Sequence, residues 1–206
     1  MMLTKEKREE NKNYFIEKLK STKRKGILDL LTFLEGTDFY MSPASSKFHN
    51  AFPGGLVDHS IKVYRLLFVK NRDYKRKIPE DSLIICGLLH DISKINNYLI
   101  ELKWNKNRET DNQWIQQKLY TINRDCMDLG HGEGSVIKLM QFIDLTDLEK
   151  AMIRFHMGLS LPKEQYYSLN NIIKLFPDVC MIITSDYEAA TLYEQNNYGE
   201  RLPVPE

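Results

Sequence analysis

The sequence has few cysteines and no local pair of them. Its three cysteines, Cys86, Cys126 and Cys180, are odd in number and far apart, so we expect neither a disulfide framework nor a zinc ribbon. A reducing compartment is favoured instead. No apolar run approaches the ~20 residues that cross a bilayer, and the charged first residues do not resemble a signal peptide. We therefore expect a cytoplasmic protein with no membrane partner.

The sequence also lacks an excess of either charge. Lysine and arginine number 29 against 28 aspartates and glutamates, for a net charge of +1. A surface built to coat DNA would show a strong basic excess, although the short basic runs 20–25 and 70–77 leave a local patch open. No Gly-rich phosphate loop is present, so NTP-driven group transfer is not expected. The 206 residues suit one domain, 1–206, with a substantial core.

Apolar residues recur at helical spacing over most of the chain. Thr146 followed by Glu149 at the start of one such segment has the spacing of a capping box. Aromatic and β-branched residues over about 97–123 instead indicate an inserted β-hairpin. The predicted fold is thus all-α, a helical bundle carrying one small hairpin, with a loop over 36–53 and an irregular tail over 196–206. The predicted helices cover about 4–20, 27–34, 55–69, 80–91, 133–142, 145–156 and 178–194.

Polar residues interrupt the apolar stripes of two of these helices. His59 lies three residues after Leu56 and four before Val63, on the stripe that faces the core. Asp186 follows Ile183 by three residues in the same way. A carboxylate in such a position is costly unless it is paired or bound to a metal ion.

Two further positions repeat the anomaly. His156 follows Met152 by four residues, and the very apolar helix before residue 91 ends in His90-Asp91. One histidine on an apolar face is usually an ordinary core residue, but three of the five histidines here occupy such positions. A single site where helices converge explains all of them. Two imidazoles and two carboxylates favour Mn, Fe, Co, Ni or Zn over Mg or Ca, and such an ion activates water and polarises a phosphoryl oxygen.

The order of a histidine, a His-Asp pair about 30 residues later and a distant aspartate resembles the HD-domain superfamily of metal-dependent phosphohydrolases. The strings FHNAFPGGLVDHS, GLLHDISK and TSDYEAA are similar to its motifs and span about residues 45–195. Trp114, LYTINRD, GHGEGSV and AMIRFHMG further resemble largely uncharacterised HD hydrolases of phages and Gram-positive bacteria with a GHGExS motif. The resemblance implies a helical core over about 45–195, with helices over 1–35 packing on it.

The resemblance also implies a set of site residues. His131 and His156 match the ligands of a second metal ion found in some members; alternatively, either contacts phosphate or acts as the general acid. Lys94 matches a lysine that contacts the scissile phosphate, or is a solvated surface residue, and Ser93 stands where the family usually has glycine. The ligands implied for the first ion are His59, His90, Asp91 and Asp186.

The function implied is hydrolysis of a nucleotide-type phosphate ester, as mono- or triphosphate, by a metal-activated water. Asp91, Lys94, His131 and His156 are the candidate catalytic residues, and one or two divalent transition-metal ions are the expected cofactor. The partner is then a small nucleotide. Two alternatives stay open: a 3′–5′ exonuclease or phosphodiesterase acting on single-stranded nucleic acid, and a nucleotide-sensing domain without turnover. Assembly as a homo-oligomer is also left open. His49 stands outside the metal set.

Overall fold

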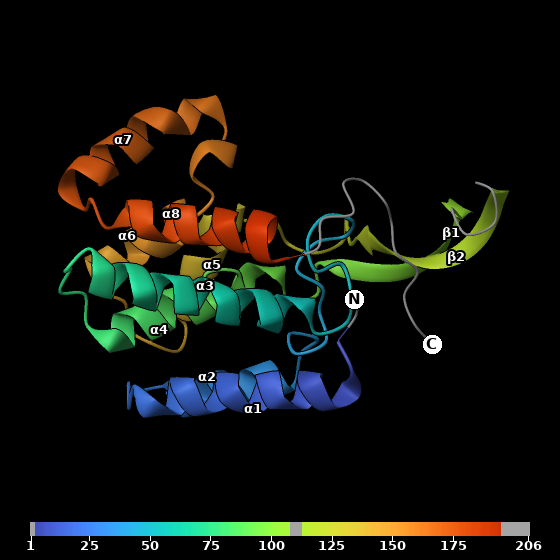
Figure 1. Ribbon diagram of the computed structural model, residues 1–206, viewed down its shortest axis with the longest axis horizontal. Coiled ribbons are helices and arrows are strands. Elements are labelled where there is room, and N and C mark those ends of the chain that lie inside the picture. Colours follow the sequence, from blue (N-terminus) through green and yellow to red (C-terminus); the bar gives the residue numbers. More distant parts are fainter. Residues whose placement is uncertain (1–2, 108–112, 195–206) are drawn as a thin grey trace.

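The computed structural model describes residues 3–107 and 113–194, and it confirms a mostly helical fold with an inserted hairpin (Figure 1). A two-stranded antiparallel hairpin is the only sheet within these ranges. None of the helices described is both long and apolar enough to cross a membrane. The helices are α1 (Lys5–Ser21), α2 (Ile27–Glu35), α3 (Gly55–Asp73), α4 (Glu80–Leu89), α5 (His131–Leu139), α6 (Asp147–Phe155), α7 (Tyr166–Leu175) and α8 (Val179–Glu188), with short 3-10 turns η1 (Ile92–Lys94), η3 (Gly158–Ser160) and η4 (Lys163–Gln165).

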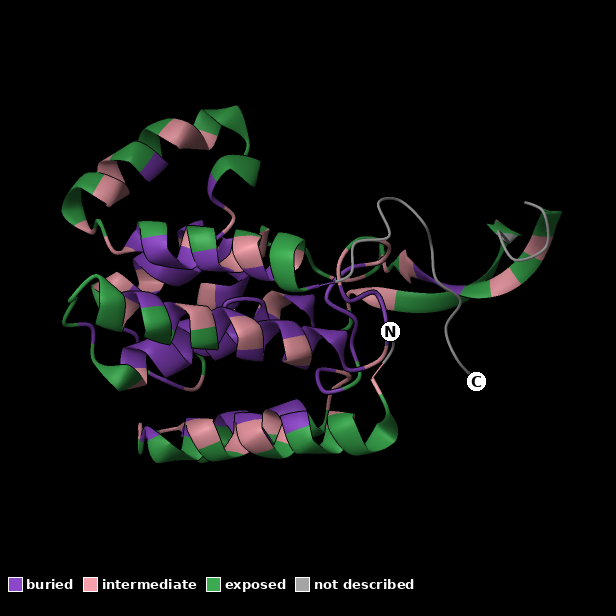
Figure 2. Ribbon diagram, in the orientation of Figure 1, coloured by how far each residue is buried: buried purple, intermediate pink, exposed green. Residues whose placement is uncertain are grey.

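Helix α3 contacts α1, α4 and α8, and α6 contacts α4, α5 and α8. Figure 1 shows α1 and α2 side by side along one face of this bundle, and Figure 2 shows the buried residues concentrated between the layers. The loop between α1 and α2 is tied to α6 by Arg24, whose guanidinium donates to both carboxylate oxygens of Glu149. Glu149 also completes the predicted capping box with Thr146, which is confirmed.

Two glycines allow the close helix packing that brings the polar residues together. A Cβ on Gly87 of α4 would lie 2.5 Å from the Cα of Tyr64 on α3, so only glycine lets these helices approach so closely. Similarly, a Cβ on Gly132 at the start of α5 would overlap the carbonyl oxygen of Arg154 near the end of α6. The first close contact brings together α3, which carries His59, and α4, which ends just before His90. The second brings together α5, which begins at His131, and α6, which ends just before His156.

The hairpin projects away from the bundle (Figure 1). Strands β1 (Tyr98–Asn107) and β2 (Gln113–Ile122) pair in register, with Trp104 opposite Gln116. Because side chains alternate along a strand, Trp104 shares one face with Ile100 and Leu102, and all three are exposed. The predicted hairpin is thus confirmed, and its tip, 108–112, lies outside the described residues.

Several boundaries differ from the sequence predictions. Helix α5 begins at His131, two residues earlier than predicted, and the last helix changes at Glu188 into a π-helical turn, η5 (Ala189–Tyr193). Helix α4 ends at Leu89 rather than at residue 91. Helix α7 was not predicted at all. The segment predicted as a loop, 36–53, forms no regular element, and the predicted tail, 196–206, lies outside the described residues.

Candidate metal centre

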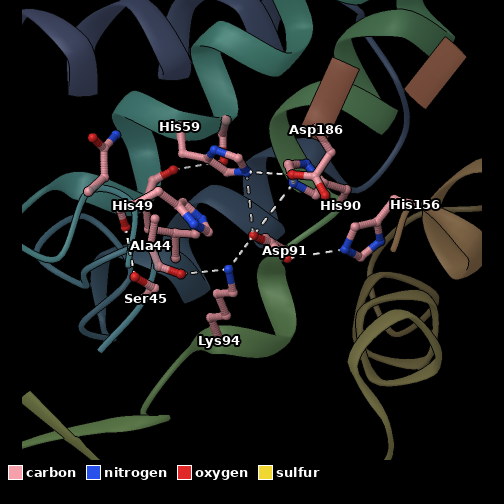
Figure 3. Close-up of polar contacts among 12 residues, drawn as sticks. Ala44, Ser45, His49, His59, His90, Asp91, Lys94, His156 and Asp186 are labelled. Atoms are coloured by element: carbon pink, nitrogen blue, oxygen red, sulfur yellow. Dashed lines mark hydrogen bonds and ion pairs between the residues drawn. The ribbon is translucent and has the colours of Figure 1, made fainter. Parts of the chain in front are cut away.

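Four of the predicted ligands meet between α3, the end of α4 and α8 (Figure 3). Asp186 Oδ1 lies 2.9 Å from His59 Nε2, and 3.8 Å from His90 Nε2. Asp91 Oδ2 lies 3.5 Å from His90 Nε2 and 3.9 Å from His59 Nε2. The convergence that the apolar-stripe argument required is therefore present. The role of these side chains as metal ligands stays a prediction.

The other carboxylate oxygen of Asp91 faces a second pair of histidines. Asp91 Oδ1 lies 2.6 Å from His131 Nε2 and 3.4 Å from His156 Nε2. His131 is the first residue of α5, and His156 directly follows the last residue of α6. Asp91 therefore stands between two groups of imidazoles, with one oxygen turned to each.

Local hydrogen bonds fix which ring nitrogen faces the site. His90 Nδ1 lies 3.0 Å from the Gly87 carbonyl oxygen, and His156 Nδ1 lies 2.7 Å from the Ile153 carbonyl oxygen. A carbonyl oxygen only accepts, so both Nδ1 atoms carry the hydrogen, and in the neutral rings Nε2 presents a lone pair. In each case the carbonyl belongs to the residue three before the histidine, at the end of its helix.

Three of the four histidine nitrogens turned toward Asp91 and Asp186 lack hydrogen-bond partners within the described residues, and the fourth, His131 Nε2, is bonded to Asp91 Oδ1. Nε2 of His59, His90 and His156 is buried in each case without such a partner. Even the 2.9 Å contact of His59 Nε2 with Asp186 does not have hydrogen-bond geometry. Buried polar atoms are rarely left unsatisfied. Buried imidazole nitrogens without a hydrogen-bond partner, facing carboxylate oxygens, fit a divalent cation, so the donor set passes the chemical test for a metal site.

The ionisation of the two carboxyl groups agrees with this fit. Burial would raise the pKa of Asp91, but Lys94 and the surrounding histidines hold it well below its usual range. The pKa of Asp186 is likewise lowered, against the effect of burial, by His59 first and then by His90 and His156. Both groups are therefore anionic, as ligands must be.

The histidines divide into two electrostatic types. Burial lowers the pKa of His90 to about 3, so this ring is neutral. Burial also acts to lower the pKa of His59, but the carboxylates of Glu194 and Asp186 outweigh it and raise the pKa to about 10. The two anions that hold a proton on His59 would equally attract a divalent ion in its place, because metal and proton compete for the same nitrogen.

Glu194 is a site residue that the sequence analysis did not identify. Its Oε1 lies 3.0 Å from His59 Nδ1, its side chain is fully buried, and Lys62 Nζ lies 3.6 Å away. The spacing could have indicated it: Glu194 follows Asp186 by eight residues, a little over two helical turns, so a continued helix would place both near one face. A carboxylate on the outer nitrogen of a ligand histidine fixes the ring and increases its basicity.

Lys94 is buried inside the site rather than solvated at the surface. Its Nζ donates to Asp91 Oδ2 and to the Ala44 carbonyl oxygen, at 2.6 Å in each case (Figure 3). Burial would lower its pKa, but Asp91 outweighs this effect and raises it, so the group is cationic. The surface-lysine alternative is therefore wrong, whereas contact with a phosphate stays a prediction.

His49, placed outside the metal set by the sequence analysis, lies beside it. Its ring centroid is 5.0 Å from that of His59, and its Nε2 is buried without a hydrogen-bond partner in the described part of the chain. Burial lowers its pKa to about 3. Glu133, the acid of the GHGE string, forms an ion pair with Arg154.

The site opens to solvent on one side. The side chain of His131 is 30% exposed and that of Asp186 is 20% exposed, whereas His59, His90 and Asp91 are buried. The partly exposed edge of the candidate site thus lies at His131 of α5 and Asp186 of α8.

Comparison with known proteins adds one finding. No family model matches the chain, and no solved structure matches it. The chain is 34% identical over 99 residues to the dihydroneopterin 2′,3′-cyclic phosphate phosphodiesterase of Methanocaldococcus jannaschii. The matched residues are 45% of this chain and 38% of the relative, so the chain spans well under half the length of this curated relative. Over that part, the chain is thus similar to a known phosphodiesterase.

Proposed function

We propose that this chain is an HD-type, metal-dependent phosphohydrolase that cleaves the phosphate ester of a small, nucleotide-type molecule. The observation that carries the proposal is the position of Asp91. One of its oxygens faces His59 and His90, and the other faces His131 and His156. A carboxylate shared in this way between two sets of buried imidazoles suits a bridging ligand. When bound, divalent ions there would activate water and offset the charge of a phosphoryl group.

Two groups of side chains would hold the ions. His59 and His90 belong with Asp91 Oδ2, because their Nε2 atoms lie near that oxygen, and Asp186 joins them because its Oδ1 faces the same two nitrogens. His131 and His156 belong with Asp91 Oδ1. We propose that both positions are used, because His156 Nε2 is buried without a hydrogen-bond partner in the described residues.

Lys94 would act on the substrate as well as on Asp91. An ammonium group has three N–H donors, and the bonds to Asp91 and the Ala44 carbonyl use two of them. The third donor is available for a phosphoryl oxygen, where added positive charge stabilises the transition state. The burial of the group strengthens that interaction, because little water screens it.

Hydrolysis then requires water to attack phosphorus while the bond to the ester oxygen breaks. The leaving oxygen takes up a proton as it departs. Of the four histidines around Asp91, His131 is the most exposed, so it is also the one that an incoming substrate would meet first. The name of the relative gives a 2′,3′-cyclic phosphate as its substrate, which is a phosphodiester. This supports ester hydrolysis over the transfer of a phosphoryl group.

The test is the Asp91→Asn variant, with Asp147→Asn as its control on an exposed aspartate of α6. Protein loaded with Mn²⁺ or Co²⁺ is analysed for bound metal and for hydrolysis of nucleoside 2′,3′-cyclic phosphates and mononucleotides. Asp91→Asn should lose both bound metal and hydrolysis, and Asp147→Asn should keep both. Full metal content and full activity in Asp91→Asn would overturn the proposal.

One observation favours a second candidate, hydrolysis of single-stranded nucleic acid. The exposed face of the hairpin carries Trp104 and Trp114 together with Lys106 and Lys118, and no described residue of that face is acidic. Aromatic rings beside lysines can stack on bases and pair with phosphates. Shortening of labelled single-stranded DNA by the loaded protein, abolished in Asp91→Asn, would favour this candidate.

A further inference from the structure

A cavity of about 400 Å³ lies against the candidate metal centre. It is bounded by the segment that follows Asp91, by the loop before α5 and by α5 itself, with Phe33 of α2 also contributing to its wall. Its volume falls toward the lower end of the ~300–1,000 Å³ typical of small-molecule pockets. A space of this volume holds one nucleoside-sized group, whereas a polymer would have to extend beyond it at both ends.

The cavity and the metal centre share a wall. His131 lines the cavity, and its Nε2 lies 2.6 Å from Asp91 Oδ1. Ser93, two residues after Asp91, also lines the cavity, and its Oγ is buried without a hydrogen-bond partner among the described residues. A phosphorus atom held near Asp91 would therefore have its organic substituent directed past His131 into this space.

The residues that line the cavity indicate the chemical nature of this organic substituent. Ile95 and Ile137 supply apolar surface, while Asn96, Asn97 and Gln141 supply amides. Within the described residues, the side chains of these three amides form no hydrogen bond, so their donors and acceptors are available to a ligand. Amides beside apolar surface match the edges and faces of a planar heterocycle.

The charges of the cavity favour a neutral occupant. Lys138 is its one lysine and Asp128 its one acid, and Asp128 Oδ1 already accepts the backbone N–H of Gly130 at 2.8 Å. A second phosphate group bound in the cavity would need several positively charged side chains around it, and Lys138 is the one lysine among the lining residues. A triphosphate tail is thus a poor match for this space.

We infer that the cavity binds the uncharged, hydrogen-bonding heterocyclic part of the substrate, so that the enzyme selects small phosphate esters of nucleoside-like alcohols. This inference rests on the proposed function for the position of the phosphate. It goes further in assigning selectivity to residues 93–97 and to α5. Ile137, half-exposed on the wall, and Asn97 are the residues whose substitution should change that selectivity.

The test compares Ile137→Trp, which fills the cavity, and Asn97→Ala, which removes an amide, with a matched control. Met140→Trp adds the same ring directly after the same helix, at an exposed residue outside the cavity lining. Substrates are nucleoside 2′,3′-cyclic phosphates and glycerol 1,2-cyclic phosphate, which has the phosphodiester but no base. Ile137→Trp and Asn97→Ala should lower kcat/KM for the nucleoside esters about tenfold or more through KM. All variants should hydrolyse the glycerol ester like the unsubstituted protein.

Direct binding separates this inference from the proposed function. Free nucleosides without phosphate are added to the Asp91→Asn protein, and binding is followed by ligand-observed NMR. Binding that is lost in Asp91→Asn/Ile137→Trp and kept in Asp91→Asn/Met140→Trp supports the cavity assignment even if no ester is hydrolysed. Absence of nucleoside binding, or an equal effect of Ile137→Trp on both ester classes, overturns it. Lack of hydrolysis of every ester with nucleoside binding intact overturns only the proposed function.

Discussion

Replacing Glu194 with glutamine should weaken metal binding without unfolding the protein. Glutamine has nearly the same shape, and its amide oxygen can still accept the hydrogen of His59 Nδ1. What is lost is the negative charge 3.0 Å from that nitrogen, in a fully buried side chain. Without that charge, Nε2 on the opposite side of the His59 ring becomes a weaker donor to a cation.

The size of the effect follows from the behaviour of such outer carboxylates. Their loss typically costs about 10–100-fold in metal affinity, which corresponds to about 1.4–2.7 kcal/mol. The upper part of this range applies here because Glu194 is fully buried and little water screens it. Lys62 also loses a partner at 3.6 Å, but it keeps its closer bond to Asp58, so the fold should tolerate the change.

The assay is competition for Mn²⁺ or Co²⁺ against a chromophoric chelator, with thermal unfolding of the metal-free protein measured in parallel. Glu188→Gln is the matched control, because Glu188 ends α8, just before the π-helical turn that leads to Glu194, but pairs with Lys70 and is partly exposed. Glu194→Gln should bind metal at least about tenfold more weakly than Glu188→Gln. Equal affinities of the two variants for the metal would refute the positioning role of Glu194.

Three further predictions concern other residues. His131→Ala and His156→Ala should each reduce metal content from two ions per chain to one, measured by elemental analysis; a content that stays at two would remove these histidines from the second position. Lys94→Met should retain metal, since Asp91 loses only a competing cation, but should lower kcat about 10²-fold in ester hydrolysis; an unchanged kcat would contradict contact with the phosphate. Burial acts to raise the pKa of Glu149, but Arg24 first and then the N-cap backbone outweigh it, so the pKa is lowered in the folded state. The resulting stability is present above the unfolded pKa of about 4.3 and is lost as the pH falls through the folded value. In urea titrations, Glu149→Gln should therefore reduce the free energy of unfolding by about 2–3 kcal/mol at pH 7 and by much less at pH 3. The loss at pH 7 is somewhat smaller than for a fully buried pair, because Arg24 is partly exposed. An equal loss at both pH values would contradict the ion-pair account.

Much of the site could be predicted because polar residues on apolar stripes carry a strong physical signal. His59 and Asp186 stand where the helical period requires apolar side chains, and the structure places them 2.9 Å apart. Periodicity shows which face of a helix is buried, but it does not show how closely two helices approach. That approach depends on local exceptions such as Gly87, whose missing side chain admits the backbone of Tyr64.

The elements that escaped prediction are those whose stability comes from their neighbours. Helix α7 contains Asn170 and Asn171 and buries only Leu169, so its own sequence favours helix weakly. The π-helical turn after Glu188 is rare and has no sequence signature that would distinguish it from a continued α-helix. The turn matters for the proposed metal centre because its last residue directly precedes Glu194.

The ends of α4 and α6 show how a helix terminus can set the chemistry of a site. In a continued α-helix, the Gly87 carbonyl would accept the N–H of Asp91, and the Ile153 carbonyl would accept the N–H of residue 157. Instead, each carbonyl accepts the Nδ1–H of the histidine that follows its helix, His90 or His156. The same bond therefore helps to end the helix, selects the tautomer and turns Nε2 toward Asp91. A histidine three residues after a carbonyl at a helix end is thus held in the orientation that the proposed ligand role requires, and this preorganisation comes from a backbone group.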